Sequence, residues 1–467
     1  MTSTPEHSEN IYSNIYADPQ SVFNIAHPPS KFKIQFGHKS NKGTGRQNQD
    51  DIFVIQESDA YIFGVADGHG YYGSYDRDRL STGKIASSVS KKSVEDFVLA
   101  NTTLLSENPV DFLEKCFECV QENVRQAFVD DIRENEPNSE VNINEDGVVV
   151  ARKYAFQNFS NITGGSMLSI AILKNGVLYI ANVGDCDGLL CAKTPILKQT
   201  NIKYEKDMAQ EKSVVYTVET LTDNLVITCD HSPDNLEEYK RIRGSAKDQS
   251  LMFIYDNQEK EKPMCEPIFE DGVDGPAVRP DVRFYYKNVS KDKATYITTP
   301  IDAQYRDALA STRSIADFNL NKYGLSAKPE IQTINLNPIF ESMTASTDPK
   351  RLCIVLCTDG VWDNWITDHV QKFVMDPSCL NAIAKPEGAQ RVVDSFMNRN
   401  DMFTKKHFGT SYDDASCVIM YITQEEEEDQ GPSAALDAKL EVLYKTETIF
   451  MEMTLSEPED CDRTNFE

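Results

Sequence analysis

The sequence contains no uninterrupted apolar stretch of about 18 residues, so no membrane-spanning helix is expected. Residues 1–20 are polar and acidic, and they lack both the apolar core of a signal peptide and the arginine-rich face of a transit peptide. Basic residues are few, because 47 Lys and Arg stand against 74 Asp and Glu, a net charge of −27. Such an acidic chain is a poor match for nucleic acid or anionic membrane, and we expect neither as a partner.

A second cysteine pair of the kind that binds zinc is also missing. The 11 cysteines are scattered and odd in number, and only Cys116 and Cys119 have the C-x-x-C spacing. That pair lies in a helical pattern without clustered histidines, which favours a core-facing stripe over the alternative of a zinc or redox site. Other cysteines occupy apolar runs, where a reduced thiol acts as a small hydrophobe. We therefore expect a reducing, intracellular location, the cytoplasm or the nucleus.

What is present is a globular composition, in which 40% of the 467 residues are hydrophobic and 26% are charged. β-Branched and aromatic runs bounded by polar turns predict strands at 32–37, 51–57, 60–68, 166–173, 177–184, 187–193, 225–230, 351–360 and 417–423. Helical periodicity covers 82–99, 109–133, 366–375 and 388–398. Because the helices are grouped in blocks and do not alternate with strands, the pattern indicates an α+β fold.

Four polar segments flank or interrupt this core. We expect residues 1–31 to form a flexible N-terminal tail and residues 134–147 to form a loop. Residues at about 245–300, rich in Lys, Asp, Glu and Pro, are interpreted as a surface insertion. Residues 424–467 contain 14 acids against 3 bases and are expected to form an acidic C-terminal tail.

Several aspartates stand at the ends of apolar strands or in the adjacent turns. Asp67 and Asp359 each follow an apolar run and precede a glycine, which lets backbone or a ligand approach closely. Carboxylate and carbonyl oxygens are the ligands that Mg²⁺ and Mn²⁺ prefer, so convergence of four or five such ends would make a di-metal site. Taken singly, an Asp at such a place is more often a solvated turn residue than a ligand, whereas the joint pattern favours a site. The other candidates are Asp50, Asp51, Asp185, Asp413 and Asp414.

A set of short motifs runs in order along the chain from Arg46 to Tyr421, which is most of its length. The segments are Arg46–Asp51, Phe63–Gly70, Gly164–Ser166, Ala181–Asp185, Asp230–Pro233, Leu309–Arg313, Asp317–Phe318, Thr358–Asp363 and Ser411–Ser416. In order and spacing this set resembles the type 2C metal-dependent serine/threonine protein phosphatases, the PPM-type family. Each motif alone is of limited specificity, whereas the ordered set is highly specific.

The resemblance implies a four-layer α-β-β-α sandwich, in which helices flank two antiparallel sheets and a di-metal site lies at one end. It implies a PPM-type phosphatase domain over residues 32–423, with the insertion at about 245–300 where the family carries a flap. The cofactors would be two Mg²⁺ or Mn²⁺ ions, with a weaker third position. Asp67 would bridge two ions, the Gly68 carbonyl, Asp359, Asp413 and Asp50 would complete the ligands, Asp51 would support them, and Asp185 would mark the third position.

The chemistry that the resemblance implies is hydrolysis of phosphoserine and phosphothreonine in protein substrates. Two metal ions lower the pKa of a bridging water, and the resulting hydroxide attacks the phosphorus. Arg46 would clamp the substrate phosphate with its planar guanidinium. His69 would protonate the leaving oxygen, although a lone histidine is more often structural. We expect the enzyme to be a monomer.

The sequence departs from the family pattern at several flanking positions. Asp187 stands where the family has an arginine, which adds negative charge near the third-metal position, and Ala316 replaces the glycine before Asp317. Met167 and Leu168 replace small residues, and the usual Asp-Asn pair is Asp413-Asp414. None of these changes removes a predicted ligand.

Two other functions compete with an active phosphatase. A catalytically silent scaffold or binding module would keep the same fold, and the altered flanks leave it open. A di-metal nuclease would use the same carboxylates but does not suit the net charge of −27. The presence of Arg46 and His69 beside the aspartates favours the enzyme.

Overall fold

The computed structural model describes residues 32–71, 80–153, 158–206, 213–245, 249–257, 264–272, 275–279, 295–343 and 349–424. All of these residues belong to one unit, which ends at Glu425. The expected tail at 1–31, the expected acidic tail beyond residue 424 and parts of the expected insertion lie outside the described ranges.

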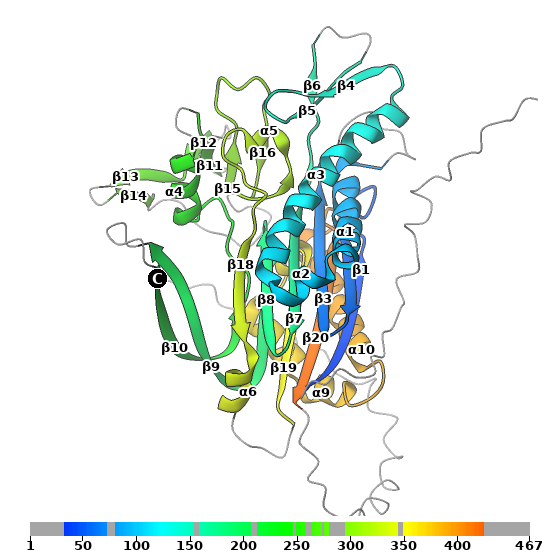
Figure 1. The fold of residues 1–467 in the computed structure, drawn as a ribbon, viewed down its shortest axis with the longest axis vertical. Coiled ribbons are helices and arrows are strands. Elements are labelled where there is room, and N and C mark those ends of the chain that lie inside the picture. The colour runs from blue at the N-terminus through cyan, green and yellow to red at the C-terminus, as the bar shows by residue number, and fades with distance from the viewer. Residues whose placement is uncertain are drawn as a thin grey trace, which may run out of the picture. The chain divides into compact units, whose positions relative to one another are not determined.

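Two large antiparallel sheets form the centre of this unit (Figure 1). The first has the strand order β1 (Phe32–Asn41), β20 (Ala415–Gln424), β19 (Arg351–Cys357), β9 (Gly188–Lys206) and β10 (Ser213–Val226). The second has the order β18 (Glu330–Asn335), β8 (Val177–Val183), β7 (Gly165–Lys174), β3 (Ala60–His69) and β2 (Asp51–Glu57), and the short β17 (Ile315–Ala316) pairs with β7.

Alternate side chains of each central strand face opposite sides of its sheet, as the strand period requires. In β3, Phe63 and Val65 pack into a cluster that contains residues of both sheets, whereas Ile62 packs into the cluster under the first helices. In β20, Met420 joins the cluster between the sheets and Ile419 joins the one under the last helices. Each sheet therefore has one face against the other sheet and one against helices.

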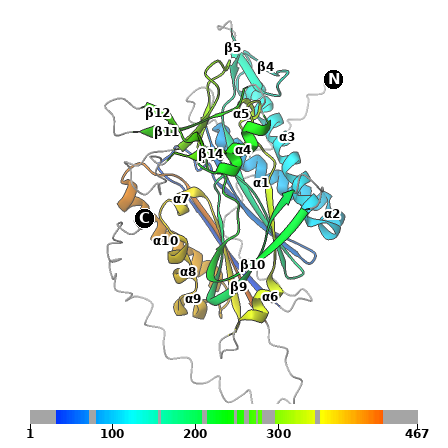
Figure 2. The same ribbon diagram turned by 90° about the vertical axis from the view of Figure 1, so that its left-hand side faces the viewer.

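Helices cover the outer faces of both sheets (Figure 2). Ser81 begins α1, because its Oγ accepts a hydrogen bond from the Lys84 amide and so satisfies one of the free donors of the first turn. One side carries α1 (Thr82–Ala100), α2 (Thr102–Glu107) and α3 (Pro109–Asn135), and the other carries α7 (Asp359–Trp362), α8 (Thr367–Val374), α9 (Pro377–Ala382) and α10 (Gly388–Phe408). The predicted α+β fold, with helices flanking two antiparallel sheets, is confirmed.

Two local predictions need correction. Residues 134–147, expected as a loop, contain β4 (Ser139–Ile143), which forms a small sheet with β5 (Val149–Lys153) and β6 (Ser160–Asn161). The residues of β4 are mostly polar and gave no strand pattern. The strand forms because it pairs with β5, which includes most of the buried apolar run at 148–151. Of the strand expected at 225–230, only residues 225 and 226 belong to β10. Beyond them, Thr228 Oγ1 donates to the Asp187 carboxylate and the Cys229 amide donates to Asn182 Oδ1.

The expected insertion at 245–300 contains regular structure in its described parts. α4 (Leu236–Ser245) precedes a sheet with the order β12 (Met264–Pro267), β11 (Met252–Asn257), β15 (Thr295–Thr298) and β16 (Ala308–Leu309), and β13 (Phe269–Gly272) pairs with β14 (Gly275–Val278). The remaining short helices are α5 (Phe318–Asn321) and α6 (Leu336–Ser342). Within the described ranges, no helix is both long and apolar enough to cross a membrane.

Candidate active site

Several strand ends meet at one edge of the two sheets. β3 ends at His69, which is paired with Gly165 at the start of β7, and β19 ends at Cys357, paired with Cys417 near the start of β20. A hydrogen bond of 2.9 Å from Thr358 Oγ1 to Asp50 Oδ2 joins the two sheets at this edge. The antiparallel topology thus brings together the segments that carry the predicted ligands Asp50, Asp67, Asp185, Asp359 and Asp413.

The carboxylate of Asp67 lies among other carboxylates. Burial is the largest cause that raises its pKa well above the usual range, and the charges of Asp50, Asp359, Asp413 and Asp185 raise it further. Burial and the neighbouring charges of Asp414 and Asp413 also raise the pKa of Asp50, although Ser416 and Thr358 hydrogen-bond to it. The predicted aspartates are therefore close enough to destabilise one another's charged forms.

This donor set has the chemistry of a site for a hard divalent cation. Carboxylate oxygens that repel one another at a partly buried place lose that repulsion when a cation binds among them. Among the residues that the structure describes, no group of three His, Cys, Asp or Glu side chains has the spacing of a metal site. The aspartates thus fit Mg²⁺ or Mn²⁺ in donor type and in mutual repulsion, without a preformed ligand shell.

Asp51 lies beside this cluster, and its carboxylate is paired with side chains of α1. Its Oδ2 accepts hydrogen bonds from Lys84 Nζ at 2.6 Å and from Ser88 Oγ at 2.7 Å. Lys84 Nζ also donates to the Asp50 carbonyl at 2.9 Å. Asp51 consequently anchors the segment that carries Asp50 to the start of α1.

Asp414 holds the loop that carries Arg46. Its Oδ1 accepts from the Gly43 amide at 2.7 Å, and its Oδ2 accepts from the Gln49 amide at 2.6 Å. A carboxylate can accept from both amides, whereas the asparagine usual in the family has one acceptor oxygen. The motif spacing placed Asp414 beside the site but gave no sign of this contact, which joins segments more than 360 residues apart.

Two glycines permit close backbone contacts at the predicted ligands. A side chain at Gly68 would overlap the Gly83 carbonyl of α1, and one at Gly360 would overlap the Asp414 carbonyl. Packing at the strand ends therefore requires the glycine of each Asp-Gly pair, independently of any ligand that binds there.

The two predicted substrate-contacting residues, Arg46 and His69, have different surroundings. Arg46 is exposed. Burial and the charges of Asp414 and Asp413 raise the pKa of the nearby Tyr71 phenol, and the charge and a backbone hydrogen bond of Arg46 partly oppose that rise. His69 Nε2 lies 2.8 Å from Asp317 Oδ2. Burial lowers the pKa of His69, but the charge and hydrogen bond of Asp317 outweigh burial, and the pKa is raised.

Asp317 is a residue whose role the sequence motifs did not identify. It is 4% exposed, and its backbone and that of Ala316 are left-handed, with φ of 43° and 66°. Ala316 stands where the family has glycine, and that departure was the one signal in the sequence of an unusual backbone at this turn.

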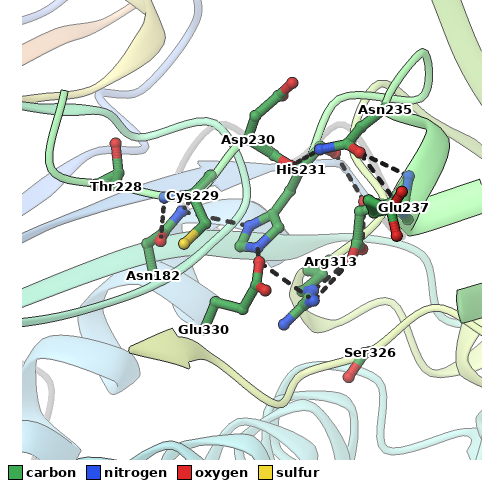
Figure 3. A network of polar contacts seen from close by, with 12 residues as sticks. Asn182, Thr228, Cys229, Asp230, His231, Asn235, Glu237, Arg313, Ser326 and Glu330 are labelled. Carbon is green, nitrogen blue, oxygen red and sulfur yellow. Dashed lines mark hydrogen bonds and ion pairs between the residues drawn. The ribbon is translucent and has the colours of Figure 1, made fainter. Parts of the chain in front are cut away.

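A second polar network joins His231, Arg313 and Glu330 (Figure 3). His231 Nδ1 accepts from the Gly184 amide at 3.2 Å, and His231 Nε2 lies 3.2 Å from Glu330 Oε2. Arg313 donates to Glu238 through Nη2 at 2.6 Å and lies 3.5 Å from Glu330. The Asp230–Pro233 and Leu309–Arg313 motifs therefore meet here.

Glu238 is the centre of charge compensation in this network. Burial would raise its pKa, but hydrogen bonds and charges from Arg313 and Arg241 outweigh burial and hold the pKa at about 2. Thr312 Oγ1 also donates to Glu238 at 2.8 Å. This carboxyl is therefore ionised throughout the physiological range.

Asp187, the acidic replacement near Asp185, makes its own local contact. Its Oδ1 accepts from Thr228 Oγ1 at 2.7 Å. Burial raises the pKa of Asp187 to about 7 in spite of this hydrogen bond, and the charge of Asp185 contributes. The negative charge added by this replacement is thus partly suppressed near neutral pH.

A cavity of about 1150 Å³ lies between the β4–β6 sheet and the segment 304–306. Its lining includes Asn142, Asn161, Tyr305 and Arg306, and it contains none of the predicted site residues. We therefore assign the candidate active site to the carboxylate cluster and not to this cavity.

The protein phosphatase 2C family matches residues 35–252, a range that includes the motifs around Arg46, Asp67 and Asp185. The resemblance drawn from the motifs is thereby confirmed over that range. No curated protein matched the sequence significantly.

Solved structures with a similar chain course include serine-threonine phosphatase 2C from Toxoplasma gondii, with 14% identity, a TM-score of 0.46, and 83% of this chain and 95% of that chain covered. A sex determining protein from C. elegans has 14% identity and a TM-score of 0.42, with coverages of 83% and 64%. A bacterial serine phosphatase has 10% identity and a TM-score of 0.41, with coverages of 85% and 100%. Because these scores are below 0.5, the fold assignment rests on the strand order and layers described above.

Proposed function

We propose that this chain, whose residues 35–252 match the protein phosphatase 2C family, is a metal-dependent protein serine/threonine phosphatase. The observation that carries the proposal is the convergence of Asp50, Asp67, Asp185, Asp359 and Asp413 from both sheets, with charges that act on one another. Like charges gathered at a partly buried place are costly for folding, and groups with strongly perturbed pKa values cluster at functional sites.

The protein side of the reaction consists of holding the ions, binding the phosphate and supplying a proton. Asp67, the Gly68 carbonyl, Asp359, Asp413 and Asp50 would hold two Mg²⁺ or Mn²⁺ ions, with Asp51 anchoring Asp50 and Asp185 at a weaker third position. When bound, the ions supply a water of lowered pKa and neutralise phosphate charge.

Arg46 and His69 then act on the substrate itself. The exposed guanidinium of Arg46 suits two parallel hydrogen bonds to a phosphoryl group. His69, paired with Asp317, supplies a proton to the departing seryl or threonyl oxygen. The substrates would be phosphoserine and phosphothreonine proteins.

The test is release of phosphate from a phosphothreonine peptide with and without Mn²⁺. We expect turnover with Mn²⁺, loss of turnover with excess EDTA, and loss in Asp359→Asn. Asp401→Asn is the matched control, because Asp401 pairs with Lys405 on the surface of α10. Binding of Mn²⁺ measured by calorimetry gives a second readout that does not depend on turnover.

The alternative function is a silent scaffold with the phosphatase fold, which the changes at Asp187 and Ala316 keep open. Folded protein that binds Mn²⁺ but releases no phosphate from any of several phosphopeptides would favour the scaffold. Turnover that persists in EDTA and in Asp359→Asn would contradict the metal-dependent mechanism.

We also propose that the protein acts as a monomer in the cytoplasm or the nucleus. Cysteines such as Cys116, Cys186, Cys353 and Cys417 are free thiols, which supports a reducing compartment. Light scattering and localisation of a tagged chain test these two statements.

A further inference from the structure

We propose that Asp317 is a positioning residue for His69, which it holds through Nε2 so that Nδ1 is presented to the leaving oxygen. The inference rests on the proposed function and deepens it, because it names the group that acts through the proton donor. His69 Nε2 and Asp317 Oδ2 are 2.8 Å apart. The Asp317 side chain is 4% exposed and that of His69 is 28% exposed, so the carboxylate side of the pair is buried while the ring also reaches solvent.

The strand register explains how the two side chains meet. His69 of β3 is paired with Gly165 of β7, and Gly165 is paired on its other side with Ala316 of β17. Asp317 and His69 therefore lie on opposite sides of β7. A side chain at Gly165 would overlap both the Ile315 carbonyl and the Asp317 carboxylate, so this glycine lets β17 pair closely with β7 and lets the carboxylate reach the imidazole.

The backbone at Asp317 is held in a costly conformation. Ala316 and Asp317 both have positive φ, of 66° and 43°, which non-glycine residues rarely adopt. Gln121 Oε1 of α3 accepts from the Ala316 amide at 2.6 Å, and the Asp317 amide donates to the Gly164 carbonyl at 3.3 Å. Contacts from α3 and from β7 thus fix the turn that aims Asp317 at His69.

This arrangement assigns the two ring nitrogens. With Nε2–H donated to Asp317, Nδ1 carries the proton that is transferred. As the phosphorus forms a bond to the attacking water oxygen, its bond to the seryl or threonyl oxygen breaks, and the Nδ1 proton passes to that oxygen. The attacking water releases its proton to solvent, the products are the free hydroxyl and inorganic phosphate, and His69 regains a proton from solvent.

The kinetic test compares two substrates in Mn²⁺-loaded enzyme. Asp317→Ala should lower kcat for a phosphothreonine peptide by about 100-fold, which is the lower end of a general acid's contribution, with KM little changed. Turnover of an aryl phosphate with a good leaving group should change far less, because little proton donation is needed there. An equal loss with both substrates would overturn the proposal.

Combined variants separate positioning from structural support. If Asp317 acts through His69, adding Asp317→Ala to His69→Ala should cause no further loss of peptide turnover. Losses that multiply in the double variant would show an independent role and overturn the proposal.

Asp307→Asn is the matched control for loss of a nearby charge. The charge of Asp307 also acts on His69, while its side chain accepts from the Ala308 amide at 3.0 Å. We expect it to retain most of the peptide turnover that Asp317→Ala loses. A loss equal to that of Asp317→Ala would reduce the role of Asp317 to general electrostatics and overturn the positioning role.

Nitrogen NMR of the His69 ring tests the pairing without any turnover. In the wild type, Nε2 should be protonated and hydrogen-bonded, and Asp317→Ala should change this signal. If the signal changes but no peptide is hydrolysed by the wild type, the proposed function fails and the pairing stands. An unchanged Nε2 signal in a variant that keeps the wild-type melting temperature would overturn the pairing itself.

Discussion

Two groups of acids in this protein have opposite electrostatic environments. Around Asp67, the neighbours that act on the carboxyl are other aspartates, and the pKa is raised. Around Glu238, the neighbours are Arg313 and Arg241, and the pKa is held at about 2. The comparison separates a charge cluster that opposes folding, as expected of a functional site, from one that stabilises the fold.

The network at Glu238 also connects segments of the chain that are distant in sequence. It joins α4, the Arg313 segment and Glu330 of β18, which are distant in sequence, and through His231 it reaches the loop before Asp185 (Figure 3). The charge-compensated network thus contacts the loop that carries Asp185, one member of the uncompensated aspartate cluster.

The largest expected effect is the loss of activity in Asp67→Asn. Because Asp67 would help to hold the proposed ions, turnover of a phosphothreonine peptide with Mn²⁺ should fall by about 1000-fold or more, roughly 4 kcal/mol of transition-state stabilisation. Near wild-type turnover in this variant would remove Asp67 from the metal site. The surface variant Asp401→Asn should retain full activity.

Breaking the compensated network should destabilise the fold strongly. Glu238→Gln removes the carboxylate that Arg313 and Arg241 share and leaves Arg313 the 3.5 Å contact with Glu330, so we expect a loss of about 3 kcal/mol in the free energy of unfolding. The adjacent Glu237→Gln is the control, because the exposed Glu237–Lys240 pair should contribute less than about 0.5 kcal/mol. Urea denaturation of both variants measures the difference, and equal effects would refute the special role of Glu238.

The same network gives a pH dependence with a defined sign. The pKa of Glu238 is lowered from 4.5 to about 2, so its contribution is fully present above pH 4.5 and is lost as pH falls toward 2. That lowering corresponds to roughly 3 kcal/mol. The stability gap between wild type and Glu238→Gln should therefore shrink between pH 4.5 and 2, and a gap that stays constant over this range would contradict the assignment.

A smaller effect is expected at the turn beside His69. Ala316 has a φ of 66°, and Gly adopts this conformation without the steric penalty of a Cβ atom. Ala316→Gly should raise the free energy of unfolding by about 1 kcal/mol. Ala181→Gly, in the middle of β8, should lower it. A destabilised Ala316→Gly protein would show that the methyl group contributes more by packing than its backbone costs.

The fold was largely predictable because its strands and helices carry strong periodicity. Runs such as 60–68 and 417–423 are apolar on both faces, as four-layer packing requires, and the motif order fixed the expected topology. β4 was missed because its residues are polar and its pairing depends on the later run at 148–151. Local patterns do not report a partner strand that comes afterwards.

The sequence motifs named candidate residues for the site but not the contacts that these residues make. Asp50, Asp67 and Asp359 were located by motif, whereas the contacts of Asp414 with the Arg46 loop and of Asp317 with His69 join segments hundreds of residues apart. A single sequence carries no spacing signal for such contacts. The glycine-to-alanine departure at Ala316 marked the turn without indicating its partner.

The most direct test of the central claim, that the aspartate cluster is a metal site whose repulsion is relieved by a cation, is the melting temperature of wild type and Asp67→Asn in EDTA and in Mn²⁺. We expect Mn²⁺ to raise the wild-type melting temperature, since a ligand at 100 times its Kd adds about 2.7 kcal/mol. In EDTA, Asp67→Asn should be at least as stable as the wild type, because one of the repelling charges is gone. A wild type that does not respond to Mn²⁺, together with an Asp67→Asn protein that is less stable in EDTA, would contradict the claim.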